Sequence, residues 1–378
     1  MFLNTGGGHR SAALAVAEAL EALYGEDVNV EAVDVTAEYF PWPLSELNAV
    51  YGWLVRFNGW PWALTYRLTN GPRRVQILQD AWCRLTGQSL LSLLKAHPAD
   101  AVVCCHPLLK APLAQSLRVR GDQASLITLV TDLASGHAAW FWPHRGKCLV
   151  ATEQTRECAL SCGLPADSVE VIGLPVRPCF ARAAEQSPAV TRKRLGLGVD
   201  RPVILLLSGA DGTGPYYSLL KGIMTSTVKI QVVAITGRNE MLRAKLISRR
   251  WPQPLHVKGF VENTHDWMRA ADLLVTKAGP TTIAEALVMG TPMVLSGAVP
   301  GQEPPNVAYV TQTGAAVWAP KPDQVAKVVR ELLSGNREEL HRMGERAKEE
   351  GGPDAARQVA RIVWRSAEPS TKLARRDG

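Results

Sequence analysis

The sequence predicts an α/β protein built from two doubly wound, Rossmann-like domains that face a common cleft. A strand, a glycine-rich loop and an apolar helix follow one another at residues 2–20, and the same order recurs at residues 203–222. Between them lies Ile172–Phe180, IGLPVRPCF, whose prolines and glycine predict a hinge. A repeated strand, glycine loop and helix on both sides of a hinge is typical of two parallel-sheet domains.

Composition agrees with two globular domains that bury large cores. The chain has 378 residues, of which 46% are apolar and 20% are charged. The first 175 residues carry 13 Lys and Arg against 16 Asp and Glu, and the remainder carries 29 against 19. A basic second half suits an anionic partner, such as a nucleotide or an acidic lipid surface. Nucleic acid is not expected, because basic runs are few and no RNA-binding aromatic motif is present.

Cysteine usage and hydropathy indicate a cytosolic protein. The seven cysteines are odd in number and show no paired CxxC spacing, which predicts reduced thiols and no zinc site. No signal peptide is visible, and no apolar run approaches the roughly 20 residues that a membrane span needs.

The first domain opens with a short strand, Met1–Asn4, and a loop of three glycines. Gly7 and Gly8 permit close backbone approach, and His9 stands at the start of the following helix. His9 is therefore a candidate catalytic residue, or a capping residue with a structural role. The loop lacks the third glycine of the dinucleotide fingerprint, which argues against a dinucleotide oxidoreductase. A second strand is expected at Val28–Val35.

Residues 39–94 combine aromatic and cationic side chains in an unusual way. Five of the eleven Trp lie here, and residues 50–95 contain six Lys and Arg against a single Asp. Such a segment fits a surface that enters a lipid interface, with rings at headgroup depth and Arg on phosphates. The alternative is a helical subdomain whose Trp fill a core. The candidates for membrane or acceptor contact are Trp60, Trp62, Arg73, Arg74 and, after a later strand, Trp140.

Polar residues follow the next strands of this domain. Strands at Ala101–Cys105 and Leu126–Val130 precede Asp132 and His137. The carboxyl ends of parallel strands point into the ligand crevice, so both side chains are site candidates. Loop capping would explain them equally well. Further strands are expected at Lys147–Ala151 and Val169–Val171.

The second domain begins with a strand at Val203–Leu207 and a second glycine loop, SGADGTGP. Its Gly209, Gly212 and Gly214 predict a phosphate-binding loop before a helix. More strands are expected at Val232–Ile235, Leu255–Val257, Leu273–Thr276, Pro292–Ser296 and Ala316–Val317. A helix is expected from His265 or Asp266 to Arg269, and further helices are expected at 322–334, 336–349 and 354–366.

A binding site for the sugar donor is predicted in the segment after Leu273. A helix opened by Thr281 or Thr282 follows a Gly/Pro loop, and free N–H groups at such a helix start attract anions. An inward Glu285 and polar residues in the later loop would complete a pocket for a nucleotide sugar. The alternative is an ordinary βαβ unit with a tight loop.

The motifs GGGHRSAA, VTDLASGHAAWFWP, GLPVRPCF, TGRNEML, VKGFV and KAGPTTIAEALVMGTPMVL with PGQEPPNVAYV keep their order along nearly the whole chain. In them the sequence resembles the monogalactosyldiacylglycerol synthase family, part of glycosyltransferase family 28. The resemblance implies a GT-B fold whose C-terminal helix crosses back to the first domain. The expected parts are an acceptor and membrane domain (1–175), a donor domain (176–350) and the crossing helix with its tail (351–378).

The resemblance also implies residue roles. His9 would be the base, and Glu285 would hold the ribose hydroxyls. The loop at Gly209–Gly214 would cradle the diphosphate, although Ser208 and Ala210 replace two glycines of the family's usual GGGxGxGP. The remaining donor-binding residues would be Phe260 and Val261 at the uracil, Gln302 and Glu303 at the sugar hydroxyls, Arg177 from the hinge, and Arg238, Lys277, Gly279, Thr281, Thr282 and Asn306.

The activity implied is inverting transfer of a hexose from a UDP-sugar to diacylglycerol, on the cytoplasmic side of an anionic membrane. Galactose is favoured by the KAGP and TIAEA segments. The alternatives are a diacylglycerol glucosyltransferase or a UDP-sugar epimerase of the same fold. No cofactor and no metal are expected, because the UDP-sugar is a substrate and no Asp-x-Asp motif is present.

Overall fold

A computed structural model describes residues 1–5, 7–56, 59–207, 209–210, 212, 214–335 and 337–367. The chain forms two compact units. Unit 1 comprises Met1–Arg177 with Asp354–Gly378, and unit 2 comprises Pro178–Pro353. The chain passes from unit 1 to unit 2 inside the Pro-rich segment that predicts the hinge.

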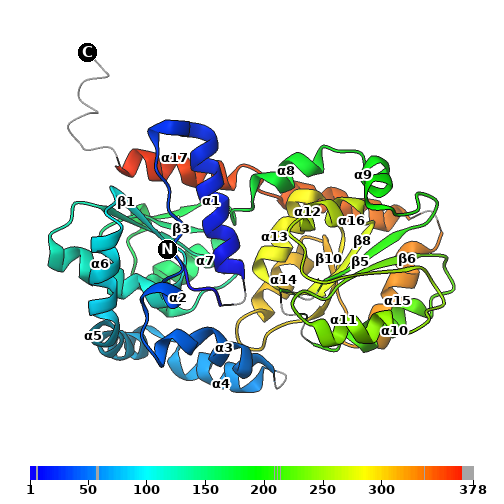
Figure 1. The fold of residues 1–378 in the computed structure, drawn as a ribbon, viewed down its shortest axis with the longest axis horizontal. Helices are drawn as coiled ribbons and strands as arrows, with labels where there is room; N and C mark the ends of the chain where they lie inside the picture. Colours follow the sequence, from blue (N-terminus) through cyan, green and yellow to red (C-terminus); the bar gives the residue numbers. More distant parts are fainter. Residues whose placement is uncertain are drawn as a thin grey trace, which may run out of the picture. The chain divides into compact units, whose positions relative to one another are not determined.

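Unit 1 is built on a parallel four-stranded sheet in the order β1-β2-β3-β4 (Figure 1). Its strands are β1 (Ala101–Cys104), β2 (Ser125–Leu129), β3 (Cys148–Val150) and β4 (Val169–Val171). These agree with the predicted strands to within two residues. Each strand is followed by a helix or a turn on the way to the next, so the carboxyl ends of all four lie at one edge.

The expected strands at Met1–Asn4 and Val28–Val35 are wrong. The structure gives only an isolated parallel bridge between Phe2 and Asp34. The backbone N–H of Cys105 still donates to the Met1 carbonyl at 3.0 Å, so the N-terminus runs beside β1. Two backbone hydrogen bonds form this bridge, from the Phe2 N–H to the Val33 carbonyl at 3.1 Å and from the Val35 N–H to the Phe2 carbonyl at 3.0 Å. The pairing goes no further because a helix begins at Val35.

The helices of unit 1 cover its sheet and form the insertion. The C-terminal helix α17 lies beside α1 in Figure 1, and the rings of Tyr24 and Trp364 stack at 4.2 Å between centroids. This confirms the crossing helix. No helix in the described part of the chain has the length and apolarity needed to span a bilayer. The helices are α1 (Gly8–Tyr24), α2 (Val35–Tyr39), α3 (Leu47–Arg56), α4 (Trp60–Thr69), α5 (Pro72–Ala96), α6 (Pro107–Arg120), α7 (Glu153–Ser161) and α17 (Ala355–Ala367).

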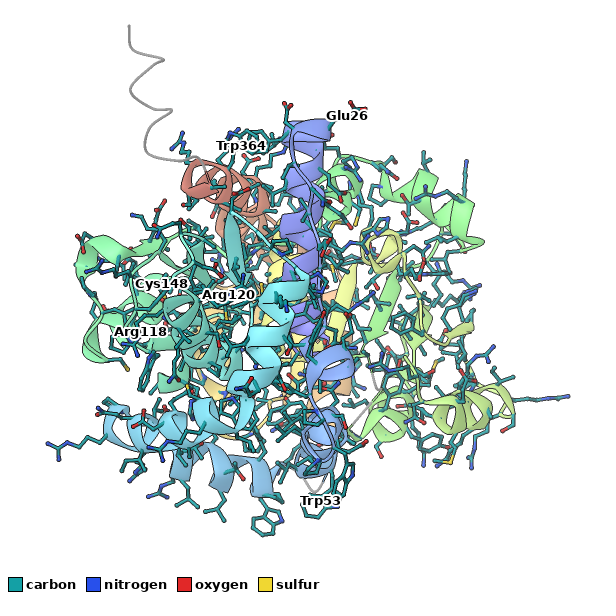
Figure 2. The ribbon with its side chains drawn as sticks, turned by 60° about the vertical axis from the view of Figure 1, so that its left-hand side comes forward. Glu26, Trp53, Arg118, Arg120, Cys148 and Trp364 are labelled. Atoms are coloured by element: carbon teal, nitrogen blue, oxygen red, sulfur yellow. The ribbon has the colours of Figure 1, made fainter. Side chains whose placement is uncertain are left out.

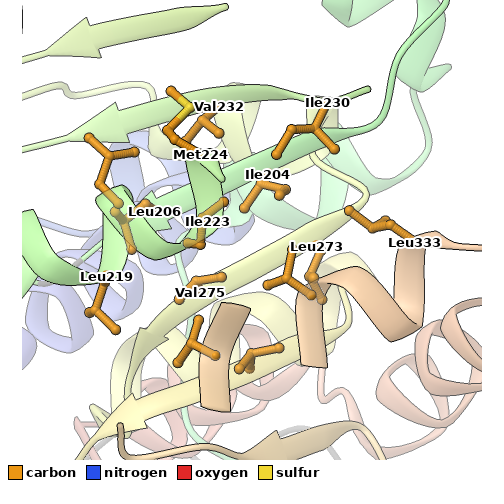
Figure 3. Close-up of a cluster of buried hydrophobic side chains, with 14 of the residues drawn as sticks. Ile204, Leu206, Leu219, Ile223, Met224, Ile230, Val232, Leu273, Val275 and Leu333 are labelled. Carbon is orange, nitrogen blue, oxygen red and sulfur yellow. The ribbon is translucent and has the colours of Figure 1, made fainter. Parts of the chain in front are cut away.

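Unit 2 contains a parallel six-stranded sheet in the order β10-β9-β8-β5-β6-β7. Its four inner strands are buried and mostly apolar, as expected for a sheet covered on both faces, whereas the two edge strands are partly exposed. Figure 3 shows Ile204, Leu206, Val232 and Val275 of this sheet packed with Ile223 of α10. The strands are β5 (Val203–Leu207), β6 (Gln231–Ile235), β7 (Leu255–Lys258), β8 (Leu273–Lys277), β9 (Met293–Gly297) and β10 (Ala316–Trp318).

The described part of unit 2 contains the five helices expected from the sequence and four that were not expected. They are α8 (Pro178–Ala184), α9 (Pro188–Leu195), α10 (Tyr216–Met224), α11 (Glu240–Ile247), α12 (Thr264–Ala270), α13 (Pro280–Met289), α14 (Pro304–Gln312), α15 (Pro322–Leu333) and α16 (Glu338–Glu350). The β8–α13 and β5–α10 connections therefore leave the carboxyl edge of the same sheet, where parallel sheets bind ligands.

Candidate functional site

His9 lies in the first turn of α1, at the carboxyl edge of the unit 1 sheet. The helix is preceded by Gly7, whose φ of 84° is in the left-handed region that glycine adopts without strain. This turn brings the Nδ1 atom of His9 within 2.7 Å of the Thr131 hydroxyl, just beyond β2. The remaining glycine of the predicted loop, Gly6, lies outside the described residues.

A second histidine, His106, packs against the ring of His9. The rings of His9 and His106 meet edge to face at 4.4 Å between centroids. His106 caps α6, because its Nδ1 accepts from the Leu108 N–H at 3.2 Å, and its Nε2 lies 3.0 Å from the Thr5 hydroxyl. The orientation of His106 is therefore fixed at both nitrogens, and it presents a rigid surface to His9.

Burial keeps the His9 ring neutral. Removal from water lowers the pKa of His9 to about 4, and a hydrogen bond to the Cys105 backbone only partly offsets this effect. A neutral imidazole has a lone pair that can accept a proton. At pH 7 the ring is therefore in the form that a general base requires.

Asp132 and Trp140 lie beside this histidine. The indole Nε1 of Trp140, which is fully buried, donates to the Asp132 carboxylate at 2.7 Å. The Trp140 ring lies 6.0 Å from that of His9. The structure thus brings three predicted residues together, with Trp140 as part of the buried wall.

His137 caps a short turn, as the loop-capping alternative predicts. Its Nδ1 accepts from the Ala139 N–H at 3.2 Å, and its Nε2 lies 3.1 Å from the Thr69 hydroxyl of α4. The ring of Tyr66 packs on it edge to face at 5.0 Å. His137 therefore ties the loop after β2 to the helical insertion.

The insertion exposes some of its aromatic residues and buries others. Trp53 and Trp60 are 55% and 63% exposed, whereas Trp62 packs against Tyr51 at 4.9 Å between ring centroids. Figure 2 shows Trp53 at the outer edge of the molecule. The core-packing alternative is confirmed for Trp62, and the lipid-interface interpretation stays a prediction for the exposed Trp53 and Trp60. The exposed apolar side chains of the insertion are Trp42, Val50, Trp53, Trp60, Leu64, Leu68, Ile77, Leu78 and Leu85, and Arg73 and Arg74 are exposed among them.

In unit 2, the helix that follows β8 starts earlier than predicted. Gly279 precedes α13, and Pro280 occupies its first position. Thr281 and Thr282 therefore lie inside the first turn, and the prediction that one of them opens the helix is wrong. Pro is favoured at a first helical position because it has no N–H and its φ already suits a helix.

A partly buried ion pair lies at the start of this helix. Lys277, the last residue of β8, pairs with Glu303, which is only 4% exposed. The Glu303 carboxylate also accepts from the Val299 N–H at 2.7 Å. A Cβ on Gly279 would lie 3.1 Å from the Lys277 ammonium, so glycine allows the close approach. Both Glu303 oxygens thus have partners inside the protein.

Three predicted donor-binding elements meet at Lys277. A Cβ on Gly209 would lie 3.6 Å from the Lys277 Cε atom, so the glycine loop after β5 comes close to this side chain. Gly212 and Gly214 have φ of 53° and 89°. The arrangement places an ammonium group and a helix N-terminus beside a glycine loop, which is suited to a diphosphate. Ser208, Asp211 and Thr213 of the loop lie outside the described residues.

The other predicted donor residues occupy the same edge of this sheet. The Arg238 guanidinium lies 5.8 Å from the ring centroid of Phe260, which is 53% exposed and precedes the half-buried Val261. Glu285 is buried on α13, and Gln302 is half-buried in the loop before α14. Asn306 donates from Nδ2 to the Ala278 carbonyl at 3.1 Å, which fixes the β8–α13 loop.

Arg177 is paired inside unit 1. Its guanidinium contacts Glu18 of α1 at 2.7 Å through Nε and one terminal nitrogen. Its predicted contact with the donor phosphates stays a prediction.

Sequence reasoning missed Thr131 and His106. Each directly follows the end of a parallel strand, and that position alone is a signal for a residue at the ligand edge.

Solved structures show the class of the fold. MurG from Acinetobacter baumannii superposes with a TM-score of 0.55 at 18% identity over 75% of this chain and 78% of that one. An S. aureus MnaA–UDP co-structure gives a TM-score of 0.60 at 14% identity over 95% of this chain and 93% of that one. A model of the glycosyltransferase family 28 C-terminal domain matches residues 209–359. Together with the two-unit architecture, these define a glycosyltransferase of the GT-B fold.

The family follows from the sequence comparisons. A model of monogalactosyldiacylglycerol (MGDG) synthase matches residues 9–176. Monogalactosyldiacylglycerol synthase 3 of Arabidopsis thaliana, a chloroplastic protein, is 32% identical over 95% of this chain and 79% of its own length. The Spinacia oleracea synthase is 34% identical over 93% of this chain and 69% of its own length. The chain belongs to the monogalactosyldiacylglycerol synthase family.

The buried histidines of unit 1 predict loss of stability in mild acid. Burial lowers the pKa values of His9, His137 and His144 to about 4, whereas an unfolded histidine titrates near 6.5. Below pH 6.5 the unfolded state binds more protons, so the free energy of unfolding falls as the pH drops toward 4. By pH 5 the three should lower it by at least about 2 kcal/mol, after allowance for partial solvent screening.

Urea unfolding at pH 7.5 and pH 5.0 measures this effect. The variant His144→Gln should show a smaller difference between the two pH values than the parent protein. A midpoint that is unchanged or higher at pH 5.0 would contradict the prediction.

Proposed function

We propose that the protein transfers galactose from UDP-galactose to the hydroxyl of diacylglycerol with inversion at the anomeric carbon, and so makes a galactolipid. The observation that carries the proposal is a neutral histidine at the ligand edge of unit 1, in a chain that belongs to the MGDG synthase family. The donor and acceptor are those that the relatives' names imply.

In the proposed mechanism His9 is the general base. Its ring takes the proton from the acceptor hydroxyl while that oxygen attacks the anomeric carbon and the bond to the diphosphate breaks. Thr131 fixes the ring through its contact with Nδ1 at 2.7 Å. Positioned base catalysis contributes about 10²–10⁴ in rate.

Unit 2 would hold the donor and stabilise its leaving group. The charge that develops on the diphosphate needs fixed positive groups, and Lys277, the glycine loop and the first turn of α13 supply them. We assign the uracil to the exposed face of Phe260 and the ribose hydroxyls to Glu285. The Lys277–Glu303 pair holds the ammonium in place before the donor binds.

The insertion in unit 1 would dock on an anionic membrane. Its exposed Trp53 and Trp60 suit the headgroup region, where the amphipathic indole ring is favoured. Arg73 and Arg74 are exposed and would bind phosphate groups, Arg74 through the nitrogens that do not donate to the Arg67 carbonyl. This makes the protein a peripheral one in our proposal, because the acceptor is itself held in the bilayer.

Radiolabelled UDP-galactose and UDP-glucose, each supplied with diacylglycerol vesicles, test the proposal directly. We expect galactolipid from UDP-galactose and little product from UDP-glucose. Glucolipid as the main product would favour the glucosyltransferase. Conversion of the free nucleotide sugar without lipid product would favour the epimerase, which shares the fold but requires no lipid acceptor.

Two tryptophans in α4 separate membrane docking from core packing. Trp60→Ala removes an exposed ring and should weaken vesicle binding roughly tenfold without a change in melting temperature. Trp62→Ala removes a packed ring and should lower the melting temperature by several degrees, an effect on the order of 2 kcal/mol. Vesicle co-sedimentation and thermal unfolding distinguish the two. If the two variants behaved alike in both assays, the assignment of Trp60 to membrane docking and of Trp62 to core packing would be wrong.

A further inference from the structure

A surface of unit 2 carries positive charge that the donor site does not use. Residues 212–261 contain eight Lys and Arg but a single acidic residue, Glu240. That carboxylate is paired with Arg243 at 3.0 Å. Apart from Arg238, which is assigned to the donor site, the cations exposed on and beside α10 and α11 are Lys221, Lys245, Arg249 and Arg250.

Two of these cations converge on one aromatic ring. The Lys245 ammonium lies 4.4 Å from the ring centroid of Tyr217, and the Arg249 guanidinium carbon lies 5.1 Å from it. Trp251 packs beside the same ring at 5.9 Å. In the part of the chain that the structure describes, no carboxylate pairs with either cation. The ring thus holds two positive charges close together in spite of their repulsion, which leaves a positive potential facing solvent.

Apolar side chains are exposed beside the cations. Met241 is 86% exposed and Ile247 is 58% exposed, whereas Leu246 of the same helix is fully buried. Helix α11 therefore packs through one face and presents both apolar and cationic side chains on the other. We define the α10–α11 patch as Lys221, Met241, Lys245, Ile247, Arg249 and Arg250.

This combination favours a lipid surface over nucleic acid. Cations bind the phosphates of either partner, but only a bilayer also accepts Met241 and Ile247 into an apolar layer. Base stacking needs a free aromatic face. Here the Tyr217 ring is already in contact with Lys245 and Arg249.

We propose that the α10–α11 patch binds the surface of an anionic phospholipid membrane, as a second docking site separate from the insertion in unit 1. The inference rests on the proposed function, in which the protein acts on a lipid held in a membrane. It adds a membrane contact on unit 2, which binds the donor. Attraction to anionic lipid increases with each cation near the surface and falls with salt.

The test uses the full-length double variant Lys245→Glu/Arg249→Glu. Its control is Lys327→Glu/Arg342→Glu, which makes the same change in net charge on α15 and α16, where Glu331 and Glu339 already compensate the cations. Binding is measured by co-sedimentation with phosphatidylcholine vesicles, with and without about one-third phosphatidylglycerol. No nucleotide sugar or diacylglycerol is added, so the result does not depend on transferase activity.

We expect the patch variant to bind the anionic vesicles at least about tenfold more weakly than the parent, and the control to stay within about twofold. Circular dichroism and retained UDP binding show that the patch variant is folded. A second variant, Met241→Ser/Ile247→Ser, keeps every charge and should also bind more weakly. Equal binding by patch and control variants would overturn the proposal, as would a preference of the parent for single-stranded RNA over anionic vesicles at equal phosphate.

Discussion

Replacing His9 with Ala is expected to lower the turnover of galactosyl transfer at least about a hundredfold and to leave UDP binding unchanged. The ring is neutral at pH 7 because burial lowers its pKa to about 4. It is therefore free to take a proton as the acceptor oxygen attacks. Turnover is measured with diacylglycerol vesicles, and UDP binding is measured by calorimetry on the same preparation.

Two further substitutions make this result specific. Thr131→Val removes the hydroxyl at Nδ1 and should reduce turnover roughly tenfold, whereas Thr131→Ser should retain most of it. His137→Ala changes another histidine of unit 1 whose pKa burial lowers to about 4. It contacts Thr69 of α4, and its loss should affect stability more than turnover. Near-normal turnover in His9→Ala would exclude His9 as the base, and the proton acceptor would then be sought at Asp132 or His137.

Much of unit 2 could be predicted from the sequence, for a clear physical reason. Strands buried on both faces read as continuous apolar runs, and glycines mark the turns that follow them. The start of α13 was misplaced because a Thr cap was preferred to Pro280, although Pro is itself favoured at a first helical position. The helices α8, α9, α11 and α14 were not predicted, because short helices give only a weak periodic signal. The register shift between Thr276 and Lys277 had no signal in the sequence.

Unit 1 was less predictable because its site depends on contacts between distant segments. The His9–Thr131 pair joins residues 122 positions apart, and His106 reaches Thr5 across 101. Spacing along a chain does not show which strand ends become neighbours. The sequence also did not show which Trp are exposed and which are packed. Trp60 and Trp62 are only two residues apart, yet Trp60 is exposed and Trp62 packs against Tyr51.

Lys277→Met is expected to weaken donor binding at least about thirtyfold and also to destabilise unit 2. The substitution removes the ammonium group beside the glycine loop and leaves Glu303 buried without its cation. An uncompensated buried charge costs on the order of 3 kcal/mol, and the Val299 N–H that remains bound to this carboxylate offsets only part of that cost. The two effects have different causes, so a second substitution can separate them.

The double variant Lys277→Met/Glu303→Gln removes the unpaired charge along with the cation. It should recover most of the free energy of unfolding, because a neutral amide still accepts from Val299 and no longer requires a counter-charge. Donor binding should stay weak, because the positive group near the diphosphate is still absent. Urea unfolding and UDP calorimetry on the parent, both single variants and the double variant complete the cycle. If donor binding recovered together with stability, Lys277 would be a structural partner of Glu303 alone, and the phosphate site would depend on the glycine loop and the first turn of α13.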